Sequence, residues 1–220
     1  MKISATVTAV NGVSLAVPVT GTTSLTVAGQ ANLVSLGTDN LVGGTAPNNT
    51  KTYIAIVTDT AGNRVAGATV AFSLRPARFR KGTYVLASSA PAPATADHWA
   101  QSVKATCPNE DLTFDGIIDT GEDLNGSGKL DPGGVATVNA TGVSDANGIA
   151  TATITYAKDH SNWAEMTLEA RTGVAGNDPP TTVDFFLPGV ASDYTNINVA
   201  PPGQTSPYGA GTSTLCTNTL

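Results

Sequence analysis

The sequence predicts an all-β protein, an antiparallel β-sandwich, and three observations lead to this fold class. Apolar and polar side chains alternate in several short segments, which is the period of a half-buried strand. Threonine occupies 33 of the 220 positions whereas charged residues make up 13%, so strand formers are abundant and the residues that long helices need are scarce. Turn signals separate the alternating segments, and no helical segment lies between them. Coiled coils and helical bundles are therefore excluded.

Six segments carry the alternating pattern and are expected to form strands. A polar, glycine-containing turn at residues 59–63 ends one of them, and a similar turn at 144–148 begins another. The expected strands are residues 3–9, 53–57, 65–74, 148–156, 164–170 and 181–187.

Two long segments lack this pattern and are expected to leave the sheets. Residues 75–110 begin with Arg-Pro-Ala-Arg-Phe-Arg-Lys-Gly and belong to an expected insertion of residues 75–134. Residues 188–220 are rich in Pro and Gly and should form an extended C-terminal tail. Loops of this length are usually functional or held by another part of the chain. Four bases near the start of the insertion could form a docking patch for an acidic partner or a solvated loop: Arg75, Arg78, Arg80 and Lys81.

The chain is expected to divide into an N-terminal strand segment, residues 1–30, and a sandwich, residues 31–220. The strand at residues 3–9 precedes the sandwich pattern and needs a pairing partner. It could be an extra edge strand of its own sheet, or a strand donated to the open sheet of a neighbouring copy. Head-to-tail donation does not close on itself and would produce a filament, so a homo-polymer is one expected assembly.

Composition limits the partners of the chain. Eleven basic residues against seventeen acidic ones give a formal net charge of −6, which argues against nucleic-acid binding. A mean hydropathy of +0.02, with no apolar run of about 18 residues, predicts no membrane span. No signal peptide is visible near Met1, so either a leader has been removed or the chain is part of a longer protein.

The two cysteines, Cys107 and Cys216, are expected to form one disulfide. Such a pair is typical of an extracellular or cell-surface protein, and it would tether the C-terminal tail. The alternative is a pair of buried free thiols in a cytosolic protein. No Cys-x-x-Cys motif or Cys/His cluster occurs, so the sequence does not predict a zinc site.

Two stretches resemble the bacterial Ig-like domains of the invasin and intimin type: VTDTAGNRVAGATVAFSL at residues 57–74 and SDANGIATATITY at residues 144–156. Arg64 stands where these domains usually have Pro, and the insertion after Leu74 is far longer than the loop of a plain repeat. The resemblance covers about residues 50–190. It implies an Ig-like sandwich, an extracellular structural or adhesive role, neighbouring Ig-like repeats, and a possible host or cell-surface ligand.

Acidic residues are concentrated in one part of the expected insertion. Residues 110–131 contain seven acids and one base, so this segment alone carries a charge of −6 and the rest of the chain is balanced. Carboxylates at this density repel one another unless a cation neutralises them. The segment divides into two 12-residue units, 111–122 and 123–134, which follow the calcium-loop template of oxygen ligands at alternate positions around a glycine.

Calcium is therefore the expected cofactor. The first unit ends in Glu122, which supplies a bidentate carboxylate, whereas the second ends in Gly134 and should bind more weakly or borrow an oxygen from a neighbour. No amphipathic helices flank the units, so they resemble tandem aspartate loops of extracellular proteins more than sensor EF-hands. The alternative is an array of Asp- and Gly-rich turns without a metal. The expected ligands are Asp111, Thr113, Asp115, Ile117 (through its carbonyl), Asp119 and Glu122, then Asp123, Asn125, Ser127, Lys129 (through its carbonyl) and Asp131.

No motif of a serine hydrolase, zinc protease or phosphate-binding loop is present. We therefore expect a non-enzymatic, calcium-stabilised structural or adhesive module of a bacterial surface protein or filament. The alternative is a carbohydrate-binding or enzyme-accessory module that uses residues 75–110. In that alternative, His98 with Trp99, or His160 with Trp163, would form a sugar-binding platform.

Overall fold

The computed structural model describes residues 2–24, 33–91, 94–172, 180–211 and 215–220. Strands make up 51% and helix 4% of the described residues, which confirms the all-β class. Met1 and residues 25–30 of the expected N-terminal segment, and residues 212–214 of the tail, lie outside the described residues. The elements are β1 (Lys2–Val10), β2 (Val13–Ser24), β3 (Leu33–Thr38), β4 (Asn48–Thr58), β5 (Thr69–Ala87), β6 (His98–Pro108), β7 (Ala136–Val138), β8 (Thr141–Val143), β9 (Ile149–Ala157), η1 (Lys158–His160), β10 (Ala164–Thr172), β11 (Thr181–Phe186) and α1 (Ser192–Thr195).

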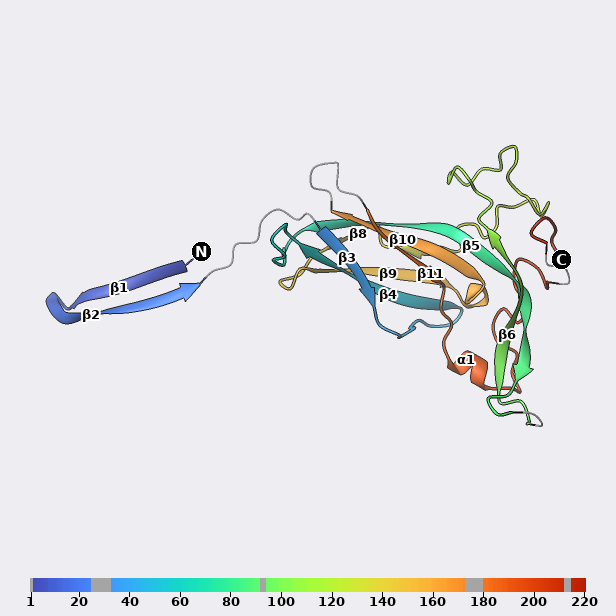
Figure 1. Ribbon diagram of the computed structural model, residues 1–220, viewed down its shortest axis with the longest axis horizontal. Coiled ribbons are helices and arrows are strands. Elements are labelled where there is room, and N and C mark those ends of the chain that lie inside the picture. The colour runs from blue at the N-terminus through green and yellow to red at the C-terminus, as the bar shows by residue number, and fades with distance from the viewer. Residues whose placement is uncertain (1, 25–32, 92–93, 173–179, 212–214) are drawn as a thin grey trace.

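The main body consists of two antiparallel sheets that face each other (Figure 1). One sheet has the order β11–β10–β5–β6, with β8 paired to the beginning of β5, and the other has the order β3–β4–β9–β7. Residues 136–143 cross between the sheets, because β7 pairs with β9 whereas β8 pairs with β5. On the opposite side, the Thr181 hydroxyl donates to the Val34 carbonyl at 2.7 Å and joins the edge strands β11 and β3. The antiparallel sandwich predicted from the alternation is confirmed.

The core lies between the two sheets and follows from the alternation in their strands. Tyr53 and Val57 of β4 belong to the same buried core cluster as Leu168 of β10, and each of these side chains is at most 5% exposed. Trp163, which immediately precedes β10, is completely buried, and its indole N–H donates to the Gly203 carbonyl at 2.7 Å. This tryptophan therefore fastens the C-terminal tail to the core.

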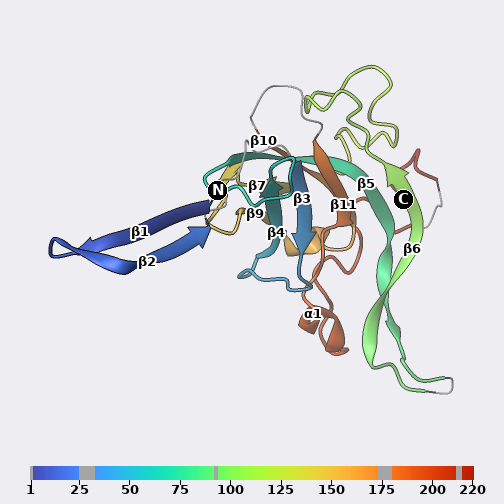
Figure 2. The same cartoon turned by 60° about the vertical axis from the view of Figure 1, so that its left-hand side comes forward.

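Strand β5 is much longer than the alternation predicts. The expectation of a strand at residues 65–74 followed by an excursion at 75–110 is wrong, because β5 starts at Thr69 and continues in the sheet to Ala87, where it pairs with β6. β5 pairs with β10 along its first half and with β6 along its second half. As a result, the β5–β6 ribbon extends beyond the sandwich (Figure 2).

The four bases at the start of the expected insertion do not form a free basic patch. Arg75 forms an ion pair with Glu169 at 3.3 Å, and Arg78 forms one with Glu165. The Arg80 guanidinium lies over the Phe186 ring, 3.5 Å from its centroid. Lys81 is completely buried. These charges fit a strand because partners on β10, β11 and the tail satisfy them.

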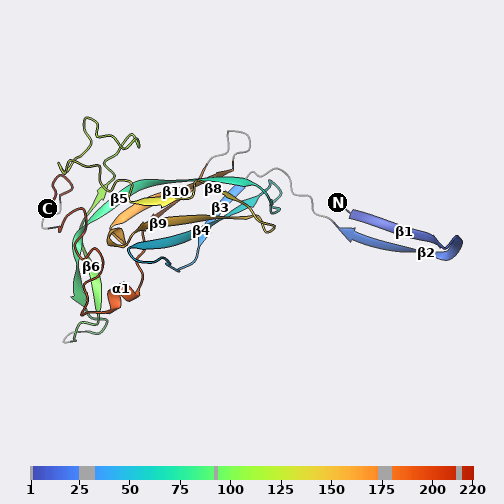
Figure 3. The ribbon, with the colours of Figure 1, turned by 180° about the vertical axis from the view of Figure 1, so that it is seen from behind.

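Residues 2–24 form a separate hairpin, β1–β2. Asn11 and Gly12 both have positive φ angles, 50° and 81°, as a two-residue hairpin turn requires. Among the described strands, β1 and β2 pair only with each other. Figures 1 and 3 show the hairpin standing apart from the sandwich, and every residue of β1 is exposed.

The C-terminal tail lies along β5, and the predicted disulfide between Cys107 and Cys216 is present. Backbone hydrogen bonds connect Tyr84 to Gln204 and Gly82 to Gly209. The buried Lys81 ammonium donates to three oxygens of the tail: the carbonyl of Leu215 at 3.0 Å, and the carbonyl and side-chain oxygen of Asn218 at 2.9 and 2.8 Å. The tail is therefore fixed both covalently and through one buried cation.

Candidate metal centre

The acidic segment lies between β6 and β7, at the end of the sandwich where Figure 1 shows an irregular loop near the C-terminus. Residues 111–131 contain no strand or helix, and all of them belong to the described part of the chain. Backbone N–H groups that donate to side-chain oxygens hold the segment in place, which is how an acidic loop without a sheet ladder can satisfy its main chain.

The first loop is organised around Asp111. One oxygen of its carboxylate accepts from the N–H of Asp115 at 3.3 Å, and the other accepts from the N–H of Gly116 at 3.0 Å. Gly116 has a φ of +75°, a conformation that glycine adopts readily and that the tight turn requires here. The Asp115 carboxylate in turn accepts from the N–H of Ile117 at 2.8 Å.

Glu122 closes the first loop. Its side chain is buried, and one carboxylate oxygen accepts from the N–H groups of Leu112 and Thr113 at 2.7 and 3.3 Å. The other oxygen accepts from the N–H of Asp119 at 3.1 Å. Thr113 and Asp119, predicted as ligands, therefore meet Glu122 through their main-chain groups.

The second loop repeats this arrangement twelve residues later. The Asp123 carboxylate accepts from the N–H groups of Ser127 at 2.8 Å and Gly128 at 3.0 Å. The Ser127 hydroxyl oxygen lies 3.4 Å from an Asp123 oxygen, 3.5 Å from an Asp131 oxygen and 3.2 Å from the Lys129 carbonyl. The Ser127 hydroxyl is thus placed among three other oxygens of the loop, each within hydrogen-bonding distance of it.

Asn125, the remaining predicted ligand of the second loop, belongs to the same cluster. Its side-chain oxygen accepts from the N–H of Ser127 at 2.7 Å, and its amide donates to Asp131 at 2.8 Å. All five predicted residues of the second loop are thus brought together.

Glu110 is the residue that the sequence interpretation missed. It is 1% exposed, and its two carboxylate oxygens accept from the N–H groups of Asn125 at 3.1 Å and Asp131 at 3.0 Å. In the second loop, Asn125 and Asp131 occupy the positions that Thr113 and Asp119 occupy in the first. Glu110 therefore does for the second loop what Glu122 does for the first.

The signal for Glu110 is present in the sequence when the repeat is started one residue earlier. Residues 110–121 read EDLTFDGIIDTG and residues 122–133 read EDLNGSGKLDPG. Each unit begins with Glu-Asp-Leu, and the glutamate of each unit closes the loop of the other. Both Glu110 oxygens are thus occupied by backbone N–H groups of the second unit, which was expected to bind calcium more weakly or to borrow an oxygen from a neighbour.

The electrostatics of Glu110 reflect its position. Burial raises the pKa of this carboxyl, and the N–H groups of Asp131 and Asn125 act in the opposite direction.

Within the described residues, no three Asp, Glu, His or Cys side chains form a group that could hold a metal ion. The oxygens that converge in the second loop are instead mixed: two carboxylates, a hydroxyl and a carbonyl. Such hard oxygens match the preference of calcium rather than that of zinc.

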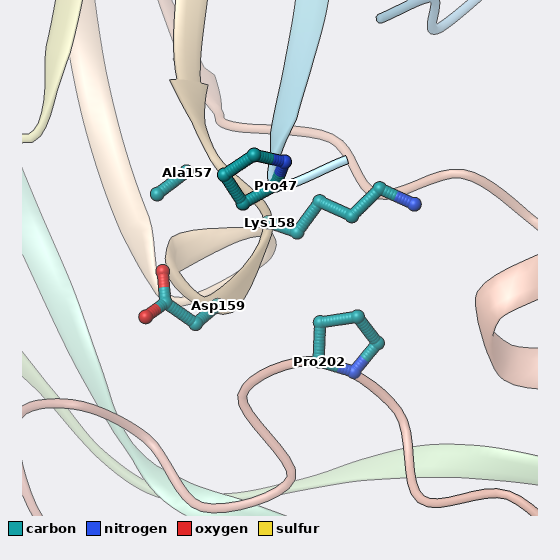
Figure 4. Close-up of a pocket in the computed structure, with 5 residues that line it drawn as sticks. All are labelled: Pro47, Ala157, Lys158, Asp159 and Pro202. Carbon is teal, nitrogen blue, oxygen red and sulfur yellow. The ribbon is translucent and has the colours of Figure 1, made fainter. Parts of the chain in front are cut away.

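Two hollows lie elsewhere on the sandwich. One, of about 280 Å³, is lined by Pro47, Ala157, Lys158, Asp159 and Pro202. Figure 4 shows the two proline rings on opposite sides of it, with the Lys158 amine and the Asp159 carboxylate pointing away from each other. The lysine is engaged by Asp193 at 2.9 Å. This hollow presents apolar walls rather than a pair of cooperating polar groups.

The second hollow, of about 510 Å³, involves one of the two tryptophans considered for sugar binding. Trp99 lines it with Asp97, His98 and Tyr194, and the Trp99 indole N–H donates to the Asn196 carbonyl at 3.1 Å. The other tryptophan, Trp163, is completely buried and cannot serve as a binding platform.

Comparison of the chain with models of protein families and with curated protein sequences gives no match. In the described part of the chain, the helices are too short or too polar to span a bilayer.

Proposed function

We propose that this protein is a non-enzymatic, calcium-stabilised structural or adhesive module of an extracellular protein. The observation that carries the proposal is the duplicated Glu-Asp-Leu unit, in which Glu110 and Glu122 each close the loop of the other unit. A solvated acidic run would not need such a reciprocal arrangement.

The charge of the segment gives calcium a physical role. Seven carboxylates and one ammonium lie within residues 110–131, so two bound divalent cations would reduce the local charge from −6 to −2. Without cations, the carboxylates repel one another at short range, and the opposing groups are the backbone N–H groups, the Asn125 amide and the single ammonium of Lys129. We infer that calcium binding stabilises the loop by removing most of this repulsion.

The position of the loop extends this effect to the sandwich. The N–H of Glu110 donates to the Asp131 carbonyl at 2.9 Å, which closes the base of the loop, and the N–H of Asn109 donates to the Ala77 carbonyl of β5 at 3.0 Å. The buried Tyr208 hydroxyl of the tail lies 3.4 Å from the Pro132 carbonyl. A loop made rigid by calcium would therefore also stiffen the junction of β5 with the tail.

The extracellular part of the proposal is supported by the disulfide, since such bonds persist mainly in oxidising compartments. The bacterial and adhesive part is supported by the resemblance of residues 57–74 and 144–156 to invasin-type Ig-like domains. Further Ig-like repeats, other copies of the chain or a host-surface ligand are then the expected partners.

Calorimetric and thermal titration with calcium tests the proposal. With a dissociation constant of about 10⁻⁴–10⁻³ M, a tenfold excess of calcium over that constant adds about 1.4 kcal/mol per site to the free energy of unfolding. The Glu122→Gln and Glu110→Gln variants should each lose most of the response of one loop. Asp97→Asn, which removes a carboxylate outside the acidic segment, is the control and should respond like the wild type. Identical melting curves in EDTA and in millimolar calcium would refute the proposal.

Carbohydrate binding is a second candidate, favoured by the hollow beside Trp99. Partly exposed aromatic rings, here Trp99 and Tyr194, can stack on the apolar face of a sugar, while Asp97 and His98 offer hydrogen bonds. Glycan binding that disappears in Trp99→Ala would support this function, and unchanged binding would exclude this surface.

A further inference from the structure

The hollow beside Trp99 lies between the far end of the β5–β6 ribbon and the short helix α1. Figures 1 and 3 show α1 beside β6, so two distant parts of the sequence meet here. Its volume of about 510 Å³ is within the range of small-molecule sites. We call it the Trp99 hollow, and the described residues that line it are Ser89, Asp97, His98, Trp99, Ala191, Tyr194 and Thr195.

The Trp99 side chain offers a ligand only the apolar surface of its ring. Its indole N–H already donates to the Asn196 carbonyl at 3.1 Å. Leu86 lies directly opposite Trp99 in the β5–β6 register, and 50% of its surface is exposed. Directly opposed residues point to the same face of a ribbon, so Leu86 extends the apolar surface beside the ring. Such a surface suits the C–H face of a sugar.

Tyr194 provides the second aromatic wall and adds no charge. Its ring centroid lies 5.0 Å from that of Tyr84, which fixes its orientation. Burial raises the pKa of the Tyr194 hydroxyl far above its usual value, so the phenol stays neutral.

Asp97 supplies the negative charge of the hollow. Its side chain is 50% exposed, and both carboxylate oxygens accept from the Ser89 N–H at 3.1 Å. One oxygen, Oδ1, also lies 2.5 Å from His98 Nδ1. The bond to His98 and those to Ser89 lower the pKa of Asp97, so the group is ionised at neutral pH. The other oxygen, Oδ2, accepts only the Ser89 N–H and keeps an acceptor site for a ligand.

No lysine or arginine is among the described residues that line the hollow. Lys158, which lies beside α1, is engaged by Asp193 of that helix at 2.9 Å. The chain as a whole has a net charge of −6, and its field therefore attracts cations and repels anions. The hollow thus combines a fixed apolar wall with one uncompensated, partly exposed carboxylate.

We propose that the Trp99 hollow binds sugars that carry a free amino group, with the ammonium beside Asp97 and the apolar face of the sugar on Trp99. This inference rests on the carbohydrate-binding candidate above and names its class of sugar. An ammonium close to an aromatic face is attracted by the ring as well as by the carboxylate. The hollow is larger than an ammonium group alone requires, and the hydroxyls of Ser89 and Thr195 can pair with those of a sugar.

The charge of the sugar determines the expected order of affinity. An N-acetylated sugar keeps the ring and loses the charge, whereas a uronic acid brings a second carboxylate towards Asp97. A half-exposed ion pair changes affinity by about fivefold at most, so the preference for the free amine should be modest.

Isothermal titration calorimetry of the full chain at neutral pH, in millimolar calcium, tests the proposal. The probes are oligomers of glucosamine, N-acetylglucosamine and galacturonic acid of equal length. The decisive variant is Asp97→Asn, which removes the charge and keeps the shape. Asp159→Asn is the matched control, because Asp159 also precedes a histidine, lies 2.7 Å from its Nδ1 and is 58% exposed, but lies outside the Trp99 hollow. Trp99→Ala removes the ring.

The wild type and Asp159→Asn should bind the glucosamine oligomer about fivefold more tightly than the N-acetylated one. Asp97→Asn should bind both equally, and Trp99→Ala should bind neither. Equal affinity of the wild type for both oligomers would overturn the proposal and leave the carbohydrate-binding candidate standing, and this comparison needs no variant. Tighter binding of the acidic oligomer, or a preference for the amine that survives Asp97→Asn, would also overturn it.

Two further outcomes separate this inference from the other proposals. Binding of the glucosamine oligomer by Trp99→Ala would place the cation elsewhere, for example on the acidic loop, and would overturn the inference. Absence of binding by all three oligomers would refute both the inference and the carbohydrate-binding candidate. Thermal melting with and without calcium is measured on the same samples, so the calcium proposal is judged independently.

Discussion

The hairpins β10–β11 and β1–β2 have the same local design and opposite environments. In β10–β11, Leu168 lies opposite Val183, and Leu168 is completely buried by the facing sheet. In β1–β2, Val7 lies opposite Val19, and these two side chains are 47% and 64% exposed. The first strand of each pair, β10 and β1, alternates apolar and polar residues up to its penultimate residue. The difference shows that alternation within a strand specifies two unlike faces. It does not specify the second sheet that buries the apolar face, which other parts of the chain must supply.

The largest expected effect is the loss of stability on removing the disulfide, a covalent link between distant residues that the sandwich has and the β1–β2 hairpin lacks. The disulfide joins residues 109 positions apart, and in the chain-entropy model a loop of this length contributes about 4–5 kcal/mol to the free energy of unfolding. Replacing Cys107 and Cys216 by serine should lower the sandwich's stability in urea by up to that amount. The β1–β2 hairpin, which contains neither cysteine, should be unaffected. A loss below about 1 kcal/mol would mean that the tail is held chiefly by its non-covalent contacts.

A smaller effect compares the two apolar faces directly. Leu168→Ala removes a side chain that is completely buried and should destabilise the sandwich by about 3 kcal/mol. Val7→Ala should change the same unfolding transition by less than about 0.5 kcal/mol. Equal effects of the two substitutions would show that the hairpin packs on the sandwich in solution, and the comparison would then fail.

The smallest expected effect is a fall in the free energy of unfolding at alkaline pH. The sandwich should show it, and the β1–β2 hairpin should not. All five tyrosines lie in the sandwich portion of the chain, and burial raises the pKa of Tyr53 to about 12. Because the pKa is raised in the folded state, the stability due to neutral Tyr53 is complete below the unfolded value of about 10 and is lost above it. Between about pH 9 and 11, this residue alone should lower the free energy of unfolding by roughly 1 kcal/mol.

Tyr53→Phe provides the matched control for that measurement. The substitution keeps the ring, whose centroid lies 4.9 Å from that of Phe185, and removes the ionisable hydroxyl. The variant should lose less stability at alkaline pH than the wild type. An identical alkaline slope in both proteins would contradict the raised pKa.

Much of the fold could be predicted because its strands carry their own signal. β4, β9, β10 and β11 all lie where the alternation places them. β2 was missed although Asn11 and Gly12 are a strong hairpin signal, because the strand that follows contains Pro18 and an irregular register. The short strands β7 and β8 depend on the sheets that they join, and three residues hold too little pattern to identify them.

The second half of β5 could not be predicted from local sequence. Arg78 lies on β5 with a half-exposed side chain, and its ion-pair partner Glu165, 87 residues away, lies beside it on β10. Lys81 is buried because oxygens of Leu215 and Asn218 surround its ammonium group. The partners of these charges are brought close only by folding. In the sequence, a charged segment with distant partners therefore looks the same as a solvated loop.

The assignment of calcium ligands in the acidic segment stays a prediction, and the template behind it omits one buried carboxylate of the loop, Glu110. The calcium-loop template identifies the side chains from Asp111 to Asp131, and the structure brings those of the second loop together. A template that begins at aspartate cannot include Glu110, because this residue precedes the first unit and acts on the second. Comparing the two units over their whole length, from each Glu-Asp-Leu, is the step that finds it.

The disulfide also determines how the module would behave under tension. A pulling force applied to the chain beyond Cys216 passes through the sulfur atoms to Cys107 and from there into β6 and β5. The residues between the two cysteines, including the acidic loop and β7 to β11, lie outside the covalent load path. At about 3.5 Å per residue, this removes roughly 380 Å of extension that the unfolded chain would otherwise yield. The module would therefore resist stretching as a short tether, and its loop would keep its geometry while the chain carries load.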